Sequence, residues 1–353
     1  MSRAFLNQVT TAVPAFEIHS HFGNFAKMMV SDRERPLVDR MIQRSGIDTR
    51  YAVIEPRDEN SPQDQLDRAG VFTRGNFPTT ATRMEIYDRE ACTLARKAAD
   101  QLDGMDDAIS HLVVTSCTGF SAPGVDLQLL ERLGLPLTTQ RTMVGFMGCY
   151  AAINGLRVAD AIVRADQNAR VLVVSVELCS LHLQETADIE TLLSFMIFAD
   201  GASAALVSAE PHGVELTGFR TALMPAARDL ITWHIGDQGF DMRLSGEVPK
   251  VLGDALPGAV DDLTGNGRQS IDLWAIHPGG RSILDACGRA LQRPESDLDA
   301  SRTVLRQYGN MSSPSIMFVM AELMRRNPPP GASGLGMAFG PGLTAEGFTF
   351  VAV

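Results

Sequence analysis

A cysteine at a strand-to-helix turn is the feature of this sequence that most constrains its fold and its chemistry. Cys149 follows an apolar, strand-like segment at residues 143–147 and precedes a helix-like segment at residues 151–163, with Gly148 at the turn between them. A thiol in this place lies over the positive end of a helix, where the dipole and free N–H groups favour the thiolate. The pattern therefore predicts a nucleophilic cysteine with a lowered pKa.

Two further motifs place a reactive side chain beside small or glycine-rich backbone. His277 ends a strand-like segment and is followed by Pro278, Gly279 and Gly280, and Asn310 lies in a Gly-Asn-Met-Ser-Ser turn. Taken singly, a cysteine is more often a small buried hydrophobe and a turn asparagine is common. Together, a thiol, an imidazole and a carboxamide supply the nucleophile, the proton-transferring group and the neutral donor that acyl transfer through a thioester requires. We therefore expect an acyl-transferring enzyme that forms carbon–carbon bonds.

Net charge, apolar segments and cysteine spacing limit the binding partners and the cellular compartment that the sequence allows. The chain has 353 residues and a net charge of −11, which argues against a general nucleic-acid binder. The first residues lack the apolar core of a signal peptide, and the longest apolar runs are too short for a transmembrane segment. Five cysteines at no metal-like spacing predict reduced thiols in a cytoplasmic protein, with no metal site.

The order of strand-like and helix-like segments indicates an α/β class with two halves. A turn cluster at residues 209–213 follows a strand-like segment, so we divide the chain into residues 1–210, with the cysteine, and residues 211–353, with the histidine and asparagine. A weak internal repeat spans this boundary: strand-like residues 107–116 and 270–277 each lead through a Gly/Pro turn to a helix-like segment. These helices are expected at residues 126–133 and 282–291, and further strands at residues 170–176, 204–207, 214–219 and 348–353. The repeat predicts two duplicated halves in a five-layered αβαβα arrangement.

With these motifs in view, the chain resembles the type III polyketide synthases, the chalcone synthase family within the thiolase fold, in their bacterial form. The likeness runs from Arg40 to the segment at residues 336–344, which closely matches the signature loop of the family. The resemblance places the catalytic triad of the family on Cys149, His277 and Asn310. It places the two gatekeepers on Phe198 and on Met242, where the family usually has Phe, and the cyclisation loop on Gly340, Pro341 and Gly342.

The resemblance also implies an iterative mechanism. An acyl-CoA starter loads onto Cys149, and malonyl-CoA loses CO2 while His277 and Asn310 donate to the oxygen of the nascent enolate. The carbanion then attacks the acyl group on the cysteine. Acyl-CoA and malonyl-CoA are the expected substrates, and no permanently bound cofactor is implied. Members of the family are homodimers, so a symmetric dimer is expected. Delivery of the starter by an acyl carrier protein stays open.

At the coenzyme A site the chain departs from the plant pattern. The family binds the CoA phosphates through basic residues of an early helix, and Arg40 and Arg44 match two of them on one helix face. Leu37 stands at a third basic position. The CoA site is expected to include Gly279, Gly280 and Ser282 as well.

At the subunit boundary, Ala122-Pro123 stands where plant enzymes have a Met-Pro pair that reaches into the cavity of the partner subunit. A cis peptide bond is plausible at this pair.

The expected pocket wall carries larger side chains than the wall in chalcone synthase. Its members are Cys117, Thr118, Cys179, His182, Trp233 and Ser312. His182 replaces a Thr and Trp233 replaces a Gly, so less room is left for a bulky aromatic polyketide. Bacterial relatives with a Trp in this setting include alkylresorcinol formers. We therefore expect a medium- or long-chain fatty acyl-CoA starter and alkylresorcinol or alkylpyrone products.

Two other classes of protein fit part of the pattern. A β-ketoacyl-ACP synthase III shares the fold and triad but stops after one condensation, and it typically has His-Gln-Ala-Asn where this chain has residues 277–280. A non-catalytic thiolase-fold scaffold that binds a lipid is the remote alternative. Starter length, the number of extensions and the mode of ring closure stay open at this stage.

Overall fold

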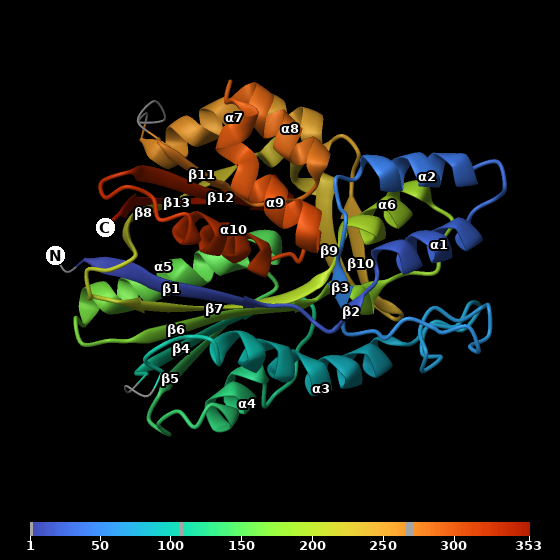
Figure 1. Ribbon diagram of the computed structural model, residues 1–353, viewed down its shortest axis with the longest axis horizontal. Helices are drawn as coiled ribbons and strands as arrows, with labels where there is room; N and C mark the ends of the chain where they lie inside the picture. Colours follow the sequence, from blue (N-terminus) through green and yellow to red (C-terminus); the bar gives the residue numbers. More distant parts are fainter. Residues whose placement is uncertain (1–2, 106–108, 266–270) are drawn as a thin grey trace.

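Within the residues that the computed structural model describes, 3–105, 109–265 and 271–353, nine strands form one mixed sheet in the order β11-β12-β13-β8-β1-β7-β6-β4-β5 (Figure 1). The first half of the chain supplies β1 (Ala4–Ala12), β4 (His111–Ser116), β5 (Gln140–Gly145), β6 (Val171–Leu178) and β7 (Asp200–Ser208). The second half supplies β8 (Val214–Leu223), β11 (Leu273–Ile276), β12 (Ser333–Gly340) and β13 (Thr344–Ala352). The two halves are therefore continuous through one hydrogen-bonded ladder.

The first strand joins the two halves. β1 pairs antiparallel with β7 over most of its length, but its residues Ala4, Phe5 and Leu6 also pair with β8. The two parts of the sheet diverge from this seam, and helices fill the space between them (Figure 1). β1 was not predicted from the sequence.

Helices on three levels complete the layers (Figure 1). α3 (Thr80–Ala99) and α4 (Val125–Arg132) cover the outer face of the first half, and α7 (Val248–Thr264) and α8 (Arg281–Ala290) cover that of the second. α5 (Ala151–Ala165) and α10 (Pro314–Arg325) lie in the middle, and α9 (Asp299–Tyr308) packs beside β11 and α10. The predicted five-layered αβαβα architecture is confirmed.

The fully apolar strands lie where the sheet is covered on both faces. Every residue of β6 is buried, as expected for a central strand between two helical layers. On the helical side, Gly155 of α5 brings the helix close to the sheet, because a Cβ there would stand 2.9 Å from Thr115 and 3.2 Å from Val173. These contacts fix α5, and with it the cysteine turn at its start, against β4 and β6.

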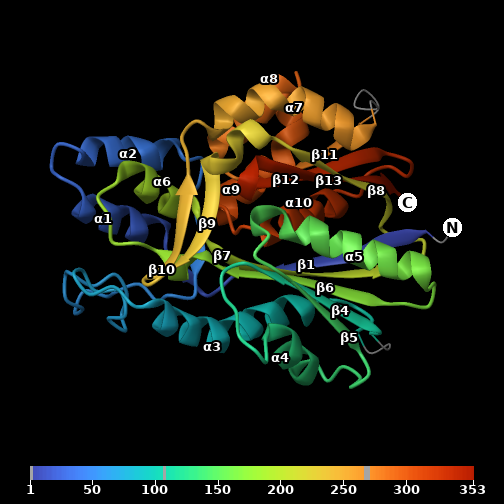
Figure 2. The same ribbon diagram turned by 180° about the vertical axis from the view of Figure 1, so that it is seen from behind.

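Three helices and a hairpin stand beside the layered core. α1 (His19–Met29), α2 (Arg35–Arg44) and α6 (Ile189–Ile197) pack together, and the hairpin of β9 (Ile231–Gly236) and β10 (Gly239–Leu244) lies between them and the layers (Figure 1, Figure 2). A small two-stranded ladder joins β2 (Phe16–Glu17) and β3 (Tyr51–Ala52). This side group covers one end of the sheet, where the predicted site residues gather.

The repeat predicted from the sequence agrees with the observed order of elements. β4 leads to α4, and β11 leads to α8, each through a turn with glycine. Residues 107, 108 and 270 of the predicted strands lie outside the described residues. No helix in the described part of the chain is long and apolar enough to cross a membrane.

Candidate active site

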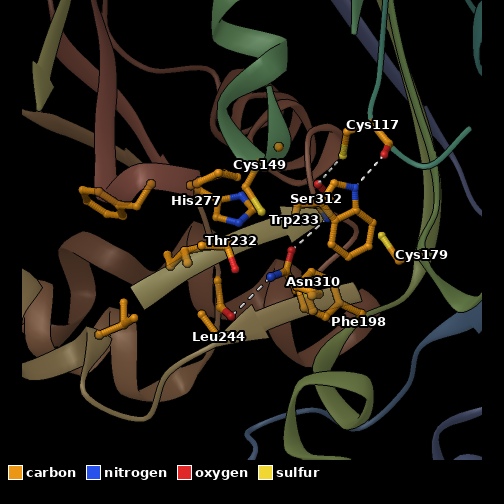
Figure 3. A pocket seen from close by; sticks show the side chains of 18 of the residues that line it. Cys117, Cys149, Cys179, Phe198, Thr232, Trp233, Leu244, His277, Asn310 and Ser312 are labelled. Carbon is orange, nitrogen blue, oxygen red and sulfur yellow. Dashed lines mark hydrogen bonds between the residues drawn. The ribbon is translucent and has the colours of Figure 1, made fainter. Parts of the chain in front are cut away.

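A cavity lies at the end of the sheet where β4, β5, β6 and β11 finish, between the layers and the β9–β10 hairpin. It encloses about 820 Å³, including its opening to solvent, and residues of both halves line it. Its wall includes Cys149, His277 and Asn310. Figure 3 shows these three side chains facing one another across the cavity. The structure therefore brings together the three residues that the sequence singled out.

Cys149 lies in a single 3-10 turn, Gly148–Tyr150, between β5 and α5, as predicted. Gly148 has φ 70°, and a Cβ there would stand 2.4 Å from the ring of Pro341, so glycine allows the cysteine turn to meet the loop after β12. Burial raises the pKa of the Cys149 thiol to about 12, although a hydrogen bond with Ser312 lowers it. The sequence pattern predicted a lowered pKa, and the structure gives a raised one, because burial disfavours the charged thiolate.

His277 follows β11, and its backbone N–H donates to the carbonyl of Met337 on β12 at 2.8 Å. Among the described residues, neither ring nitrogen has a hydrogen-bond partner. Burial lowers the pKa of this imidazole to about 3, so it is neutral at physiological pH. A neutral, unpartnered imidazole beside a thiol can accept a proton at one nitrogen and donate from the other.

Asn310 is fixed from both sides. Its backbone N–H donates to Ile197 and its carbonyl accepts from Ala199, each at 2.8 Å. Its side-chain oxygen accepts from the N–H of Ser312 at 2.8 Å, and its Nδ2 donates to the carbonyl of Gly279 at 3.3 Å. These contacts orient the amide nitrogen, whose second N–H is free to meet a ligand in the cavity.

The two expected gatekeepers both line the cavity. Phe198 directly follows α6, and the buried guanidinium of Arg50 donates to its carbonyl at 2.7 Å. Met242 stands opposite Trp233 in the register of the β9–β10 hairpin. Both side chains line the cavity, so the hairpin and α6 together set its width.

The indole of Trp233 forms part of the pocket wall, as expected. Its Nε1 donates to the carbonyl of Cys117 at 2.9 Å, which holds the ring in place (Figure 3). Cys117, Thr118, Cys179 and Ser312 also line the cavity, and the Sγ of Cys117 lies 3.6 Å from the Oγ of Ser312.

His182 lies in a different place from the one expected. It is fully buried and does not line the cavity, because its ring stacks on Phe240 at 4.1 Å and meets Trp233 edge to face. Its Nε2 pairs with the carbonyl of Thr118, and its Nδ1 accepts from the N–H of Phe240. His182 therefore supports the wall from behind.

A buried carboxylate behind the wall was missed. Glu177 of β6 accepts from the N–H of Cys117 and from the hydroxyls of Thr118 and Ser313, at 2.9, 2.7 and 2.6 Å. Burial raises its pKa above the usual value. A single charged residue within the apolar run of β6 was the signal that could have revealed it. Its contacts fix the backbone that carries Cys117 and the loop that carries Asn310.

An open groove leads from the surface into the cavity. Leu37, Arg40 and Arg44 of α2 line one side. The other side includes Gly279, Gly280, Arg281 and Ser282, and the groove shares Leu244, Val248, Gly279 and Ile283 with the cavity. The expected CoA-binding residues therefore meet in one place. Arg281 was not predicted, because the resemblance places the phosphate-binding cations of the family on the early helix.

Of the remaining predicted residues, some line the cavity and the others lie outside it. Gly340 and Pro341 line it, whereas Gly342 does not. The Ala122–Pro123 peptide bond is cis, and both residues are exposed in a separate surface depression. Their assignment to a boundary with a partner subunit stays a prediction.

Comparisons with known proteins agree with this picture. The family description "Chalcone and stilbene synthases, N-terminal domain" matches residues 4–211, and the corresponding C-terminal domain matches residues 215–353. The chain is 33% identical over 343 residues to the α-pyrone synthesis polyketide synthase-like Pks18 of Mycobacterium tuberculosis, with 92% of this chain and 84% of that protein covered. It is 31% identical over 331 residues to bisdemethoxycurcumin synthase of rice, Oryza sativa, with 87% and 81% covered.

Among solved structures, PKS-I of the brown alga Ectocarpus siliculosus superposes with a TM-score of 0.89 at 28% identity, over 100% of this chain and 99% of that one. The type III polyketide synthase domain of Steely1 from Dictyostelium also gives 0.89, at 27% identity over 99% of both chains. Fold and site together define an acyl-transferring enzyme of the thiolase fold. Within that class, the chain belongs to the chalcone and stilbene synthase family and is a type III polyketide synthase.

Proposed function

We propose that this polyketide synthase extends a medium- or long-chain fatty acyl-CoA with malonyl-CoA and releases an alkylpyrone or alkylresorcinol. The observation that carries the choice of starter is the indole of Trp233, held on the cavity wall by its hydrogen bond to Cys117. A fixed indole narrows the space beside the thiol, which favours a slim alkyl chain over an aromatic ring. The similarity to Pks18, which is named for α-pyrone synthesis, supports a pyrone product.

In the proposed loading step, the sulfur of Cys149 attacks the carbonyl carbon of the acyl-CoA thioester. Because burial raises the pKa of this thiol to about 12, proton transfer to His277 accompanies the attack. The imidazolium then protonates the departing CoA thiolate, which leaves as a free thiol. The acyl group stays on Cys149 as a thioester.

In the proposed extension step, malonyl-CoA loses CO2, and negative charge develops on its thioester oxygen. An N–H of His277 and the Nδ2 of Asn310 are the donors for that oxygen, both from a buried wall in which hydrogen bonds to charge are strong. The enolate carbon attacks the acyl group on Cys149 and releases the thiolate. The lengthened chain, now on CoA, returns to Cys149 for the next round.

The test is a competition between starters. The purified protein receives malonyl-CoA with equal amounts of dodecanoyl-CoA and coumaroyl-CoA, and products are quantified by mass spectrometry. We expect the alkyl product to predominate at least tenfold. In Trp233→Gly, the preference should fall or reverse, because the cavity gains the volume of an indole.

A matched control is Trp274→Phe, a change of the chain's other tryptophan, which is buried beside Arg293 away from the cavity. It should keep the wild-type preference. A wild-type protein that prefers coumaroyl-CoA would contradict the proposed starter.

A further inference from the structure

A fully buried arginine, Arg50, lies behind the end of α6 and has no part in the proposed mechanism. Its guanidinium lies over the ring of Phe22, with 5.3 Å between Cζ and the ring centre. Among the described residues its hydrogen-bond partners are neutral. Nε donates to the Nδ1 of His19 at 3.2 Å, and Nη1 donates to the carbonyls of Phe195 and Phe198 at 2.5 and 2.7 Å. A cation buried among neutral partners destabilises a fold, so its presence indicates a role beyond packing.

The guanidinium is charged at physiological pH in spite of its burial. Burial lowers the pKa of Arg50 to about 9, although the charges of Glu17 and Asp200 raise it. Burial and the Arg50 charge also lower the pKa of His19 to about 4, so its Nδ1 carries no proton and can accept. Hydrogen bonds from a charged donor are stronger than those from a neutral one, above all away from water. The end of α6 is therefore held by a strong, fixed donor.

Arg50 binds the part of α6 that a helix leaves without partners of its own. The last carbonyls of a helix have no intrahelical donor. The carbonyl of Phe195 is one of them, and Phe198 is the first residue after the helix. One nitrogen of Arg50 meets both carbonyls, because each terminal guanidinium nitrogen has two N–H groups. The arginine therefore fixes the direction in which the chain leaves α6.

The same end of α6 holds the backbone of Asn310. The N–H of Asn310 donates to Ile197 and its carbonyl accepts from Ala199, each at 2.8 Å, in a short parallel bridge. Gly309 lets the two segments approach, because a Cβ there would stand 2.9 Å from the carbonyl oxygen of Ile197 and 3.2 Å from the Cβ of Arg50. A shift at the end of α6 therefore displaces Asn310 as well.

We propose that Arg50 is a positioning residue for the extension step, which acts through the end of α6 to hold Asn310 and Phe198 in place. This inference rests on the proposed function, in which Asn310 is a donor to the enolate oxygen, but it does not depend on which starter is used. The loading step uses Cys149 at the start of α5 and His277 after β11, and Arg50 contacts neither. Loss of the arginine should therefore slow extension and spare loading.

The experiment measures the two partial reactions separately in Arg50→Met. One is the conversion of malonyl-CoA to acetyl-CoA and CO2 without a starter, in which the enolate takes up a proton. The other is the burst of free CoA when dodecanoyl-CoA loads Cys149. We expect decarboxylation to fall about tenfold to a hundredfold, because small displacements of a donor cost much of its effect. Loading should stay within about threefold of the wild type. Equal losses in both reactions, or undiminished decarboxylation, would overturn the inference.

Arg83→Met is the matched control. Arg83 is also a fully buried arginine, and its guanidinium donates to the carbonyls of Leu181 and Leu183 rather than to the end of α6. This variant should lose stability but keep the wild-type ratio of the two rates. If it shows the same selective loss as Arg50→Met, the effect is general to buried cations and the inference fails.

Two milder variants keep the test independent of how Arg50→Met folds. Arg50→Lys keeps the charge and should restore part of the decarboxylation rate. His19→Leu removes the acceptor that orients the guanidinium and should slow decarboxylation about threefold without slowing loading. Normal decarboxylation in both variants would count against the inference.

Asn310→Ala separates failure of this inference from failure of the proposed function. If Asn310→Ala decarboxylates malonyl-CoA as fast as the wild type, the proposed extension step fails, and the inference fails with it. If Asn310→Ala is slow while the Arg50 and His19 variants keep the wild-type rate, only the inference about Arg50 fails. Slow decarboxylation in all of them, with loading preserved, is the result that we expect.

Discussion

The thiol and the imidazole at the centre of the site are both neutral in the free protein. Burial raises the pKa of Cys149 to about 12 and lowers the pKa of His277 to about 3. Low dielectric surroundings disfavour the charged form of each group. In the proposed mechanism the nucleophile is therefore generated during the attack, when the proton moves to His277.

This arrangement predicts the pH dependence of Cys149 alkylation. In the free protein, the rate with iodoacetamide should rise about tenfold per pH unit from pH 6 to 9, because the thiolate fraction grows throughout a range that lies below the pKa. The measurement is the rate of carbamidomethylation of the peptide containing Cys149, followed by mass spectrometry.

Cys287 of α8 is fully buried and should stay unmodified over the same pH range, which shows that the protein remains folded during the measurement. A rate for Cys149 that levels off below pH 8 would contradict this account and would indicate a preformed thiolate–imidazolium pair.

At the scale of elements, α2 and the start of α8 form two sides of the groove that leads to the thiol. Arg40 and Arg44 lie on α2, and Arg281 begins α8 opposite them. Leu37, which lines the same groove and stands at the family's third basic position, is 40% exposed. Arg281, from the second half of the chain, therefore adds a positive charge to the groove in which Leu37 supplies none.

We predict that Arg281→Ala raises KM for the acyl-CoA starter about fivefold to tenfold and leaves kcat within twofold. The lost interaction is with phosphate groups far from the reacting carbon, so it affects binding and the transition state equally. Steady-state kinetics at low and high salt check this, and the difference between the two proteins should shrink at high salt.

Arg289→Ala is the matched control, because Arg289 is an exposed arginine of the same helix that does not line the groove. An unchanged KM in Arg281→Ala would contradict a role for this cation in CoA binding.

The elements differ in how far they could be predicted. Strands such as β6 were found because an unbroken apolar run is typical of a strand covered on both faces. The resemblance indicated α2 as the early helix with Arg40 and Arg44, but α1, α6 and the packing of the three helices were not predicted, because their positions depend on contacts far apart in the sequence.

In the site, too, the residues with a local sequence signature were predicted, and those placed by long-range packing were not. The triad was predicted because each residue has a local turn signature, but the place of His182 behind Trp233 depends on packing across a hairpin that no local pattern encodes. The resemblance supplied the pocket list, and the structure decided which of its members face the cavity.

At the scale of the whole molecule, one continuous sheet joins the two halves of the chain. β1 pairs with β7 of the first half and with β8 of the second, and the helices α5 and α10 are buried between the two parts. Neither residues 1–210 nor residues 211–353 can bury these surfaces alone.

We therefore predict a single cooperative unfolding transition by differential scanning calorimetry, with matching curves from circular dichroism and tryptophan fluorescence. Trp233 and Trp274 report on the hairpin and on β11, so the fluorescence covers the second half. Two resolved transitions, or a stable folded fragment of residues 1–210 expressed alone, would contradict this prediction.

The most direct test of the account as a whole is product analysis with isotopic labelling. The purified protein is incubated with dodecanoyl-CoA and uniformly ¹³C-labelled malonyl-CoA, beside Cys149→Ala as the control. The account predicts alkylpyrones or alkylresorcinols that carry two or more labelled two-carbon units and that are absent from the control. Products with a single labelled unit, or equal products from Cys149→Ala, would contradict iterative condensation on this cysteine.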